Sequence, residues 1–127
     1  MVALDYRGIA EGYVAAWAER DDARRRALIE RVWAERGEYL TPTTDLLVGP
    51  DALTRHIGAF YQRFPGHRIL LTSSVDGHHD HLRYNWAMVS PEGKTLLEGQ
   101  DVAWIGAAGK IQRLTEFFGP LPPLEST

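Results

Sequence analysis

The second half of the sequence contains four strand-like runs of similar length, joined by short segments rich in turn-forming residues. The runs cover residues 67–77, 81–89, 96–105 and 110–119, and the turn segments that join them, 76–80, 90–94 and 106–110, each contain glycine. Runs joined in this way pair most simply as an antiparallel meander. This pattern constrains the fold strongly, because a meander has two faces and at least one of them needs cover from another layer.

The first half of the chain is expected to supply that cover as three helices. Apolar side chains repeat three and four residues apart in residues 5–20, 21–36 and 50–64, and capping residues precede each segment. Two short strand candidates, 38–42 and 45–49, lie between the second and third helices. Helices followed by a meander predict an α+β domain with about three helices and about six mostly antiparallel strands. The run Arg24, Arg25 and Arg26 is expected to form a solvated helix face.

Composition and charge exclude several classes of protein. The 127 residues include no cysteine, which excludes disulfides, thiolate metal sites and cysteine nucleophiles. A net charge of −3 gives no electrostatic case for nucleic-acid binding. The sequence contains no apolar run of about 18 residues, which is the length needed to span a membrane. Its first residues lack the apolar core of a signal peptide. We expect a cytoplasmic protein in which residues 1–127 form a single domain, with 120–127 as a Pro-rich tail.

Two segments could suggest a cofactor or a metal ion, but neither meets the requirements. In residues 106–110 the two glycines are only three apart, Ile111 replaces the hydroxyl residue of a phosphate loop, and a strand follows instead of a helix. His79 and His81 would share one face of a strand, but no third metal ligand is evident nearby. We therefore expect no cofactor and no metal ion.

The order and spacing of these segments resemble the nuclear transport factor two-like (NTF2-like) superfamily, and especially its SnoaL-like branch of polyketide cyclases and small bacterial proteins. The resemblance extends from about Tyr6 to Pro122. It is most specific in the final hairpin, where Gly-x-Asp at 99–101 is followed by a glycine turn, Lys110-Ile111 and Phe-Phe-Gly at 117–119. It implies a cone-shaped barrel, in which a curved sheet wraps around the helices and an apolar pocket lies between them. It also implies a homodimer formed through the outer sheet face.

Asp101 and Tyr13 are the first candidate catalytic residues. In ketosteroid isomerase-like relatives, the matching aspartate stays protonated and donates a hydrogen bond beside a tyrosine of the first helix. In SnoaL-like cyclases the aspartate of this region is the general base instead, and the sequence leaves both roles open. The isomerase's own catalytic base corresponds to Thr41, whose hydroxyl cannot replace a carboxylate, so steroid-type isomerisation is not expected.

Arg83 is the third candidate catalytic residue, and its direction depends on the hairpin register. If Ser90 pairs with Lys94 and the register continues, Arg83 lies opposite Asp101 on the same face and would keep that aspartate ionised. A β-bulge would change the parity and turn Tyr84, Trp86 and Met88 inward instead. Both registers remain open.

Glu116 has a similar ambiguity. Alignment with the family points Leu114, Glu116 and Phe118 to the interior, whereas simple hairpin counting pairs Thr115 with Asp101 and sends Glu116 to the other face. An arginine with two acids is similar to the set with which limonene epoxide hydrolase-like relatives activate water. Glu116 is therefore assigned to the ligand-binding residues, and the wall of the pocket is expected to include Trp17, Leu53, His56 and Trp86.

The resemblance implies a small-molecule enzyme that transfers a proton on an apolar cyclic or polyketide-like substrate. The alternative is a ligand-binding or protein-interaction module of the same fold without enzymatic activity, because this fold hosts several unrelated functions. The expected partners are a small apolar molecule in the pocket and a second copy of the chain, with neither nucleic acid nor a membrane. Apolar residues at alternate positions of the meander would form the dimer face: Tyr84, Trp86, Val102 and Trp104.

Overall fold

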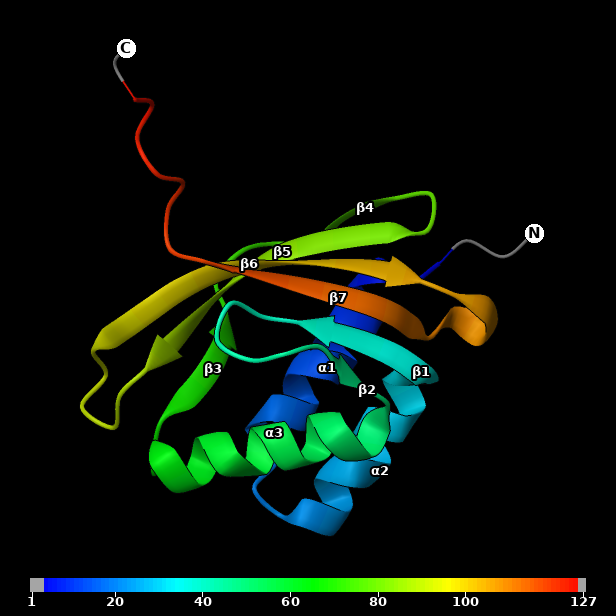
Figure 1. Cartoon of the computed structure of the whole chain (residues 1–127), viewed down its shortest axis with the longest axis horizontal. Coiled ribbons are helices and arrows are strands. Elements are labelled where there is room, and N and C mark those ends of the chain that lie inside the picture. The colour runs from blue at the N-terminus through cyan, green and yellow to red at the C-terminus, as the bar shows by residue number, and fades with distance from the viewer. Residues whose placement is uncertain (1–3, 126–127) are drawn as a thin grey trace.

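In the computed structural model, which describes residues 4–125, three helices lie against one face of a curved, open sheet (Figure 1). The helices are α1 (Tyr6–Ala18), α2 (Asp22–Val32) and α3 (Pro50–Arg63). The strands are β1 (Trp33–Leu40), β2 (Leu47–Val48), β3 (Arg68–Leu71), β4 (Asp76–His78), β5 (His81–Val89), β6 (Thr95–Ile105) and β7 (Ile111–Phe118), with a 3₁₀ turn at Ala107–Gly109. The predicted α+β class is confirmed. The expected tail has no helix or strand as far as Glu125, and its last two residues lie outside the described range.

The helices begin where their capping residues predict. The side chain of Asp5 accepts the Gly8 N–H at 3.0 Å, and that of Asp21 accepts the Arg24 N–H at 2.9 Å. Pro50 occupies the first turn of α3, where its missing N–H costs nothing.

The second helix is shorter than predicted. It ends at Val32 and not at Gly37, and Trp33 begins β1 instead of completing the helical stripe. Trp33 pairs with Ile111 of β7, and its indole N–H donates to the Gly37 carbonyl at 3.0 Å. Burial of this large ring against a distant strand outweighs the local helical preference of the segment.

The sheet brings the two halves of the chain together. Its order is β2-β1-β7-β6-β5-β3, with β4 paired to the other end of β5. All neighbours are antiparallel except β1 and β7, which run parallel. The sheet has seven strands and not six, because the predicted run 67–77 divides into β3 and β4.

Two β-bulges set which side chains face the helices. Val89 pairs with Thr95 but Met88 pairs with Leu97, so Leu96 is an extra residue in β6. Ile105 pairs with Ile111 but Trp104 pairs with Arg113, which makes Gln112 an extra residue in β7. Each bulge reverses the parity of every position beyond it. Beyond the bulges, Asp101 is the cross-strand partner of both Tyr84 and Glu116.

A tightly packed core joins the helices to the inner face of the sheet. Its most deeply buried apolar side chains come from every layer: Tyr13, Ile29, Trp33, Tyr39, Leu53, Ile57, Leu82, Ile111 and Leu114. Truncating an aliphatic member to alanine typically costs about 2–5 kcal/mol. This core fixes the positions from which the polar residues of the cavity project.

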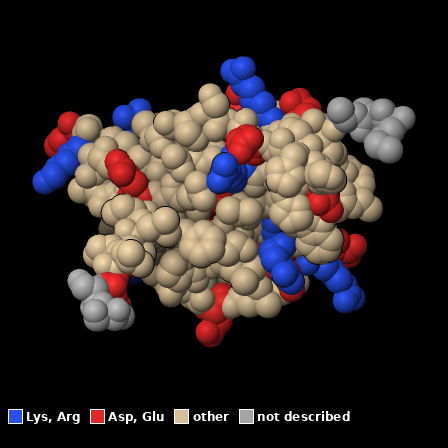
Figure 2. Space-filling view, turned by 90° about the horizontal axis from the view of Figure 1, so that it is seen from above, with Lys and Arg blue, Asp and Glu red and all other residues tan. Residues whose placement is uncertain are grey.

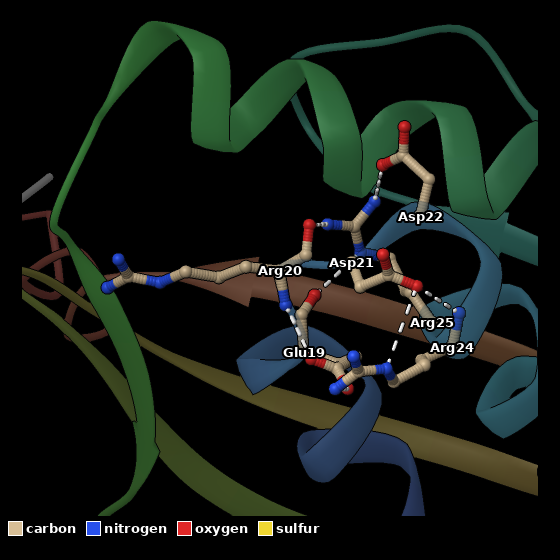
Figure 3. A network of polar contacts seen from close by, with 6 residues as sticks. All are labelled: Glu19, Arg20, Asp21, Asp22, Arg24 and Arg25. Atoms are coloured by element: carbon tan, nitrogen blue, oxygen red, sulfur yellow. Dashed lines mark hydrogen bonds and ion pairs between the residues drawn. The ribbon is translucent and has the colours of Figure 1, made fainter.

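A buried arginine connects α1 to α2 (Figure 3). Arg25 is 1% exposed, and its guanidinium donates to the carbonyls of Glu19 (2.9 Å) and Arg20 (3.1 Å) and to the Asp22 carboxylate (2.7 Å). These carbonyls follow the end of α1, where the backbone lacks helical partners. The prediction of a solvated arginine face is therefore wrong for Arg25, which closes the corner between the two helices.

Candidate functional site

A cavity of about 470 Å³ lies between α1, α3 and the inner face of the sheet. Its volume is in the range of pockets that hold small organic ligands. Exposed lining residues, namely Thr43, Thr44, Ala59 and Arg63, mark its opening. The remaining lining residues are mainly apolar or aromatic: Tyr13, Val14, Trp17, Tyr39, Thr41, His56, Phe60, Phe64, Ile69, Tyr84, Trp86, Met88, Leu97, Asp101, Glu116 and Phe118.

Asp101 lies at the buried end of this cavity and is 3% exposed. One carboxyl oxygen accepts the Tyr84 hydroxyl at 2.7 Å, and the other accepts the Trp86 indole N–H at 3.0 Å. Both donors come from β5 and face inward because of the bulge at Leu96. Burial, followed by the charge of Glu116, raises the pKa of Asp101 well above its ordinary value, although the two donors oppose that rise.

Glu116 lies directly across from Asp101 on β7 and is the second acid of the cavity. Its Oε1 atom accepts the Tyr39 hydroxyl at 3.0 Å and the Thr41 hydroxyl at 2.8 Å. Burial raises the pKa of Glu116, while its hydrogen bonds, including one with Asp101, act in the opposite direction. We refer to Asp101 and Glu116 as the carboxyl pair. Since two adjacent buried carboxyls cannot both ionise cheaply, the pair holds a proton to a higher pH than an isolated carboxyl would.

Tyr13 projects from α1 toward the carboxyl pair. Its hydroxyl oxygen accepts the Trp17 indole N–H at 2.8 Å, and its ring stacks on Trp33 with centroids 5.7 Å apart. Burial, followed by the charges of Asp101 and Glu116, raises the pKa of Tyr13 well above 10. The phenol therefore stays protonated and can serve as a hydrogen-bond donor.

His56 lines the cavity from α3. Its ring lies 5.3 Å from the Tyr39 ring and 5.9 Å from the Trp17 ring, measured between centroids. Burial lowers the pKa of His56, so the imidazole is mostly uncharged near neutral pH. The positions of Trp17, His56, Trp86 and Glu116 on the cavity wall agree with the sequence-based expectation.

Two of the predicted site residues do not reach the cavity. Arg83 lies on the outer face, where its guanidinium pairs with Asp76 at 2.9 Å and both side chains are mostly exposed. The bulge at Leu96 is the reason, since it selects the register that turns Arg83 outward. Leu53 is completely buried in the core between the helices and is not part of the cavity wall.

The sequence interpretation did not assign to the site three residues that hold the carboxyl pair, although one of its two open registers turned Tyr84 inward. Tyr39 and Thr41 bond Glu116, and Tyr84 bonds Asp101. Residues 39 and 41 are two apart at the end of a strand, which is a signal for a shared face. The partnership of Tyr39 with Glu116 required the pairing of β1 with β7, and local patterns carry no signal for that pairing.

The outer sheet face carries exposed apolar residues. Figure 2 views the molecule from this side, where most of the surface is uncharged, with scattered acidic and basic groups. Phe117 is 57% exposed and Trp104 is 40% exposed. The expected contribution of Tyr84 and Trp86 to this face is wrong, because both rings point inward to the cavity.

Two further observations concern metals and membranes. Within residues 4–125, no group of three or more histidine, aspartate or glutamate side chains is arranged to hold a metal ion. None of the helices in that range has both the length and the apolar character needed to cross a bilayer.

Comparison with known proteins identifies similar structures. No protein-family model and no curated protein matches this chain. A candidate isomerase of the SnoaL-like family from Agrobacterium tumefaciens is 35% identical, with a TM-score of 0.86 over 91% of this chain and 97% of the other. An NTF2-like protein of unknown function from Exiguobacterium is 17% identical, with a TM-score of 0.70 over 89% and 99% of the two chains. A candidate polyketide cyclase from Sinorhizobium meliloti is 14% identical, with a TM-score of 0.68 over 87% and 94%. The last two similarities concern the fold alone.

Proposed function

Because the chain belongs to the SnoaL-like family, we propose that it catalyses proton transfer on an apolar cyclic or polyketide-like substrate held in the cavity. One observation carries this proposal: two adjacent acids, each with a raised pKa, lie at the buried end of a mainly apolar cavity. Such an arrangement supplies a proton acceptor and a proton donor within one site. The similarity to a candidate isomerase that is 35% identical supports the same class of chemistry.

The proposed step begins with ionised Glu116 and protonated Asp101. Glu116 removes a proton from the carbon next to a substrate carbonyl, and the electron pair of that C–H bond moves onto the carbonyl oxygen. The hydroxyls of Tyr13 and Asp101 donate hydrogen bonds to the resulting enolate oxygen. Return of the proton from Glu116 to a different carbon completes an isomerisation and restores the enzyme. In a cyclase, the enolate carbon would instead attack a second carbonyl of the same substrate, and the alkoxide formed there would take the proton from Glu116.

The surrounding residues fit these roles. Oε1 of Glu116 accepts both the Tyr39 and the Thr41 hydroxyls, which leaves Oε2 free of these two donors. Tyr84 and Trp86 fix the orientation of the Asp101 carboxyl through separate oxygens. Donors that are already in position spare the reorganisation that water would require when the enolate forms.

The test is proton exchange on a simple cyclic ketone. Hydrogens next to the carbonyl of 1-tetralone are followed by NMR in D₂O with wild-type protein. We expect exchange faster than in buffer, and a loss of about 10²-fold or more in Glu116→Gln and Asp101→Asn. Arg83→Gln is the matched control, since Arg83 lies outside the cavity, and it should retain wild-type exchange. A panel of cyclic ketones that exchange no faster than in buffer would refute the proposal.

A ligand-binding protein without catalysis is the second candidate. It is favoured by the fact that both oxygens of Asp101 already accept hydrogen bonds within the protein. The same experiment separates the two functions. A binding protein would give no exchange in the wild type, while 1-tetralone would still quench the fluorescence of Trp17 and Trp86, which line the cavity.

A further inference from the structure

We propose that the ligand of this cavity is amphiphilic, with an anionic group bound by Arg63 at the opening and an uncharged carbonyl end directed at the carboxyl pair. The inference rests on the proposed function in one respect, namely that the reacting end lies beside Asp101 and Glu116. The recognition of the anionic group is a separate property of the opening and is tested by binding alone.

Arg63 is the cationic side chain of the cavity lining. It is the last residue of α3, it is exposed, and it borders the opening. Its guanidinium carbon lies 5.5 Å from the ring centroid of Phe64, another lining residue, so the side chain is supported beside the opening by a cation–π contact. None of the ion pairs formed within residues 4–125 involves Arg63. Its N–H groups are therefore available to a ligand.

The charges of the lining dictate the orientation of such a ligand. Asp101 and Glu116 lie at the buried end and become negative when they ionise, whereas Arg63 lies at the solvent end. A carboxylate placed at the buried end would be repelled and would lose its hydration without compensation. At the opening, the same group gains charge-assisted hydrogen bonds and remains partly hydrated.

Apolar side chains separate the two ends. The wall between them is formed by Val14, Trp17, Phe60, Phe64, Ile69, Met88, Leu97 and Phe118. Such a wall favours one or two fused rings over a flexible polar chain. The ligand class is therefore a ring system with a carbonyl at one end and a carboxylate, or another anion, at the other.

The experiment uses two probes that differ in a single charge: 6-acetyl-2-naphthoate and its methyl ester. Both have a ketone at one end and two fused rings, and only the acid carries an anion. Affinities are measured by isothermal titration calorimetry and by quenching of tryptophan fluorescence. We expect wild-type protein to bind the acid about tenfold or more tightly than the ester, which is the scale of a charge-assisted hydrogen bond.

Substitutions test whether Arg63 causes the preference for the acid. Arg63→Gln should reduce the acid-to-ester ratio to near one while leaving ester affinity unchanged, and Arg63→Lys should retain part of the preference. Arg68→Gln, which removes an exposed arginine of β3 outside the cavity lining, should behave as wild type. Equal binding of the two probes by the wild type, a preference that persists in Arg63→Gln, or no binding of either probe would each overturn the inference. Asp101→Asn should keep the preference, so loss of catalysis and loss of anion recognition are distinguishable.

Discussion

Asp101 and Glu116 face each other across neighbouring strands, and their carboxyl groups enter the same cavity. Acids directly opposite each other in a sheet normally destabilise it when both are ionised. Here four donors surround the pair: Tyr84 and Trp86 on one acid, Tyr39 and Thr41 on the other. The raised pKa of each acid reduces the repulsion further, because the pair then ionises fully only at a higher pH.

The first prediction concerns stability and pH. The folded pKa of Asp101 lies well above the ordinary value of 3.8, so between these two values the folded state binds more protons than the unfolded state. The stabilising contribution of Asp101 is thus complete below the ordinary pKa and is lost as the pH rises through the folded pKa. We expect Asp101→Asn to gain stability relative to the wild type as the pH rises from about 4 to 8, measured by urea unfolding. A difference that is constant with pH would contradict the raised pKa.

The second prediction concerns Tyr84. Its hydroxyl stabilises the ionised form of Asp101, so Tyr84→Phe should raise the pKa of Asp101 further and cost about 1 kcal/mol of stability. Carboxyl-carbon NMR would follow the titration. Tyr39→Phe is the matched control, since it removes a donor from Glu116 instead and should raise the pKa of that group. Midpoints that do not move in either variant would show that the hydroxyls do not bond the acids.

The third prediction concerns Arg25. Arg25→Met leaves the carbonyls of Glu19 and Arg20 without their donor and should cost about 3 kcal/mol, or roughly 10 °C in melting temperature. The control is Arg24→Met, since Arg24 is the neighbouring residue but its side chain is mostly exposed. It should change stability by less than about 0.5 kcal/mol. Equal effects in the two variants would mean that the buried network contributes nothing specific.

The fourth prediction concerns oligomeric state. We expect a homodimer formed through the outer sheet face, where Phe117 and Trp104 are exposed. Phe117→Asp should produce a monomer in analytical ultracentrifugation. Leu121→Asp changes an even more exposed apolar residue of the tail and should leave the dimer intact. A wild-type protein that is monomeric at high micromolar concentration would refute the prediction.

The sequence predicted the α+β class and the helix starts, because capping residues and hydrophobic periodicity are local signals. The position of Asp101 in a cavity was instead implied by the resemblance to the NTF2-like superfamily. The directions of Arg83 and Glu116 could not be settled from local counting. Both hairpins begin in the register that counting gives, since Ser90 bonds Lys94 and Ile105 pairs with Ile111. A bulge beyond each turn then reverses the faces.

Trp33 shows a second limit of sequence interpretation. Its spacing from Ile29 fits a helix, yet the ring belongs to a strand that pairs with residues almost eighty positions away. A local window contains no information about that partner. The same pairing places Tyr39 beside Glu116, which explains why the donors to the second acid were not anticipated.

The parallel pairing of β1 with β7 also governs when the site can exist during synthesis. Synthesis runs from the N-terminus, so Tyr39 and Thr41 are made 77 and 75 residues before Glu116, the acid that they bond. A nascent chain that ends before residue 111 therefore has an apolar hollow without its second acid and a β1 strand with one unpaired edge. Until β7 is added, that edge of β1 is open to pairing with other strands, and the cavity has one carboxyl instead of a pair.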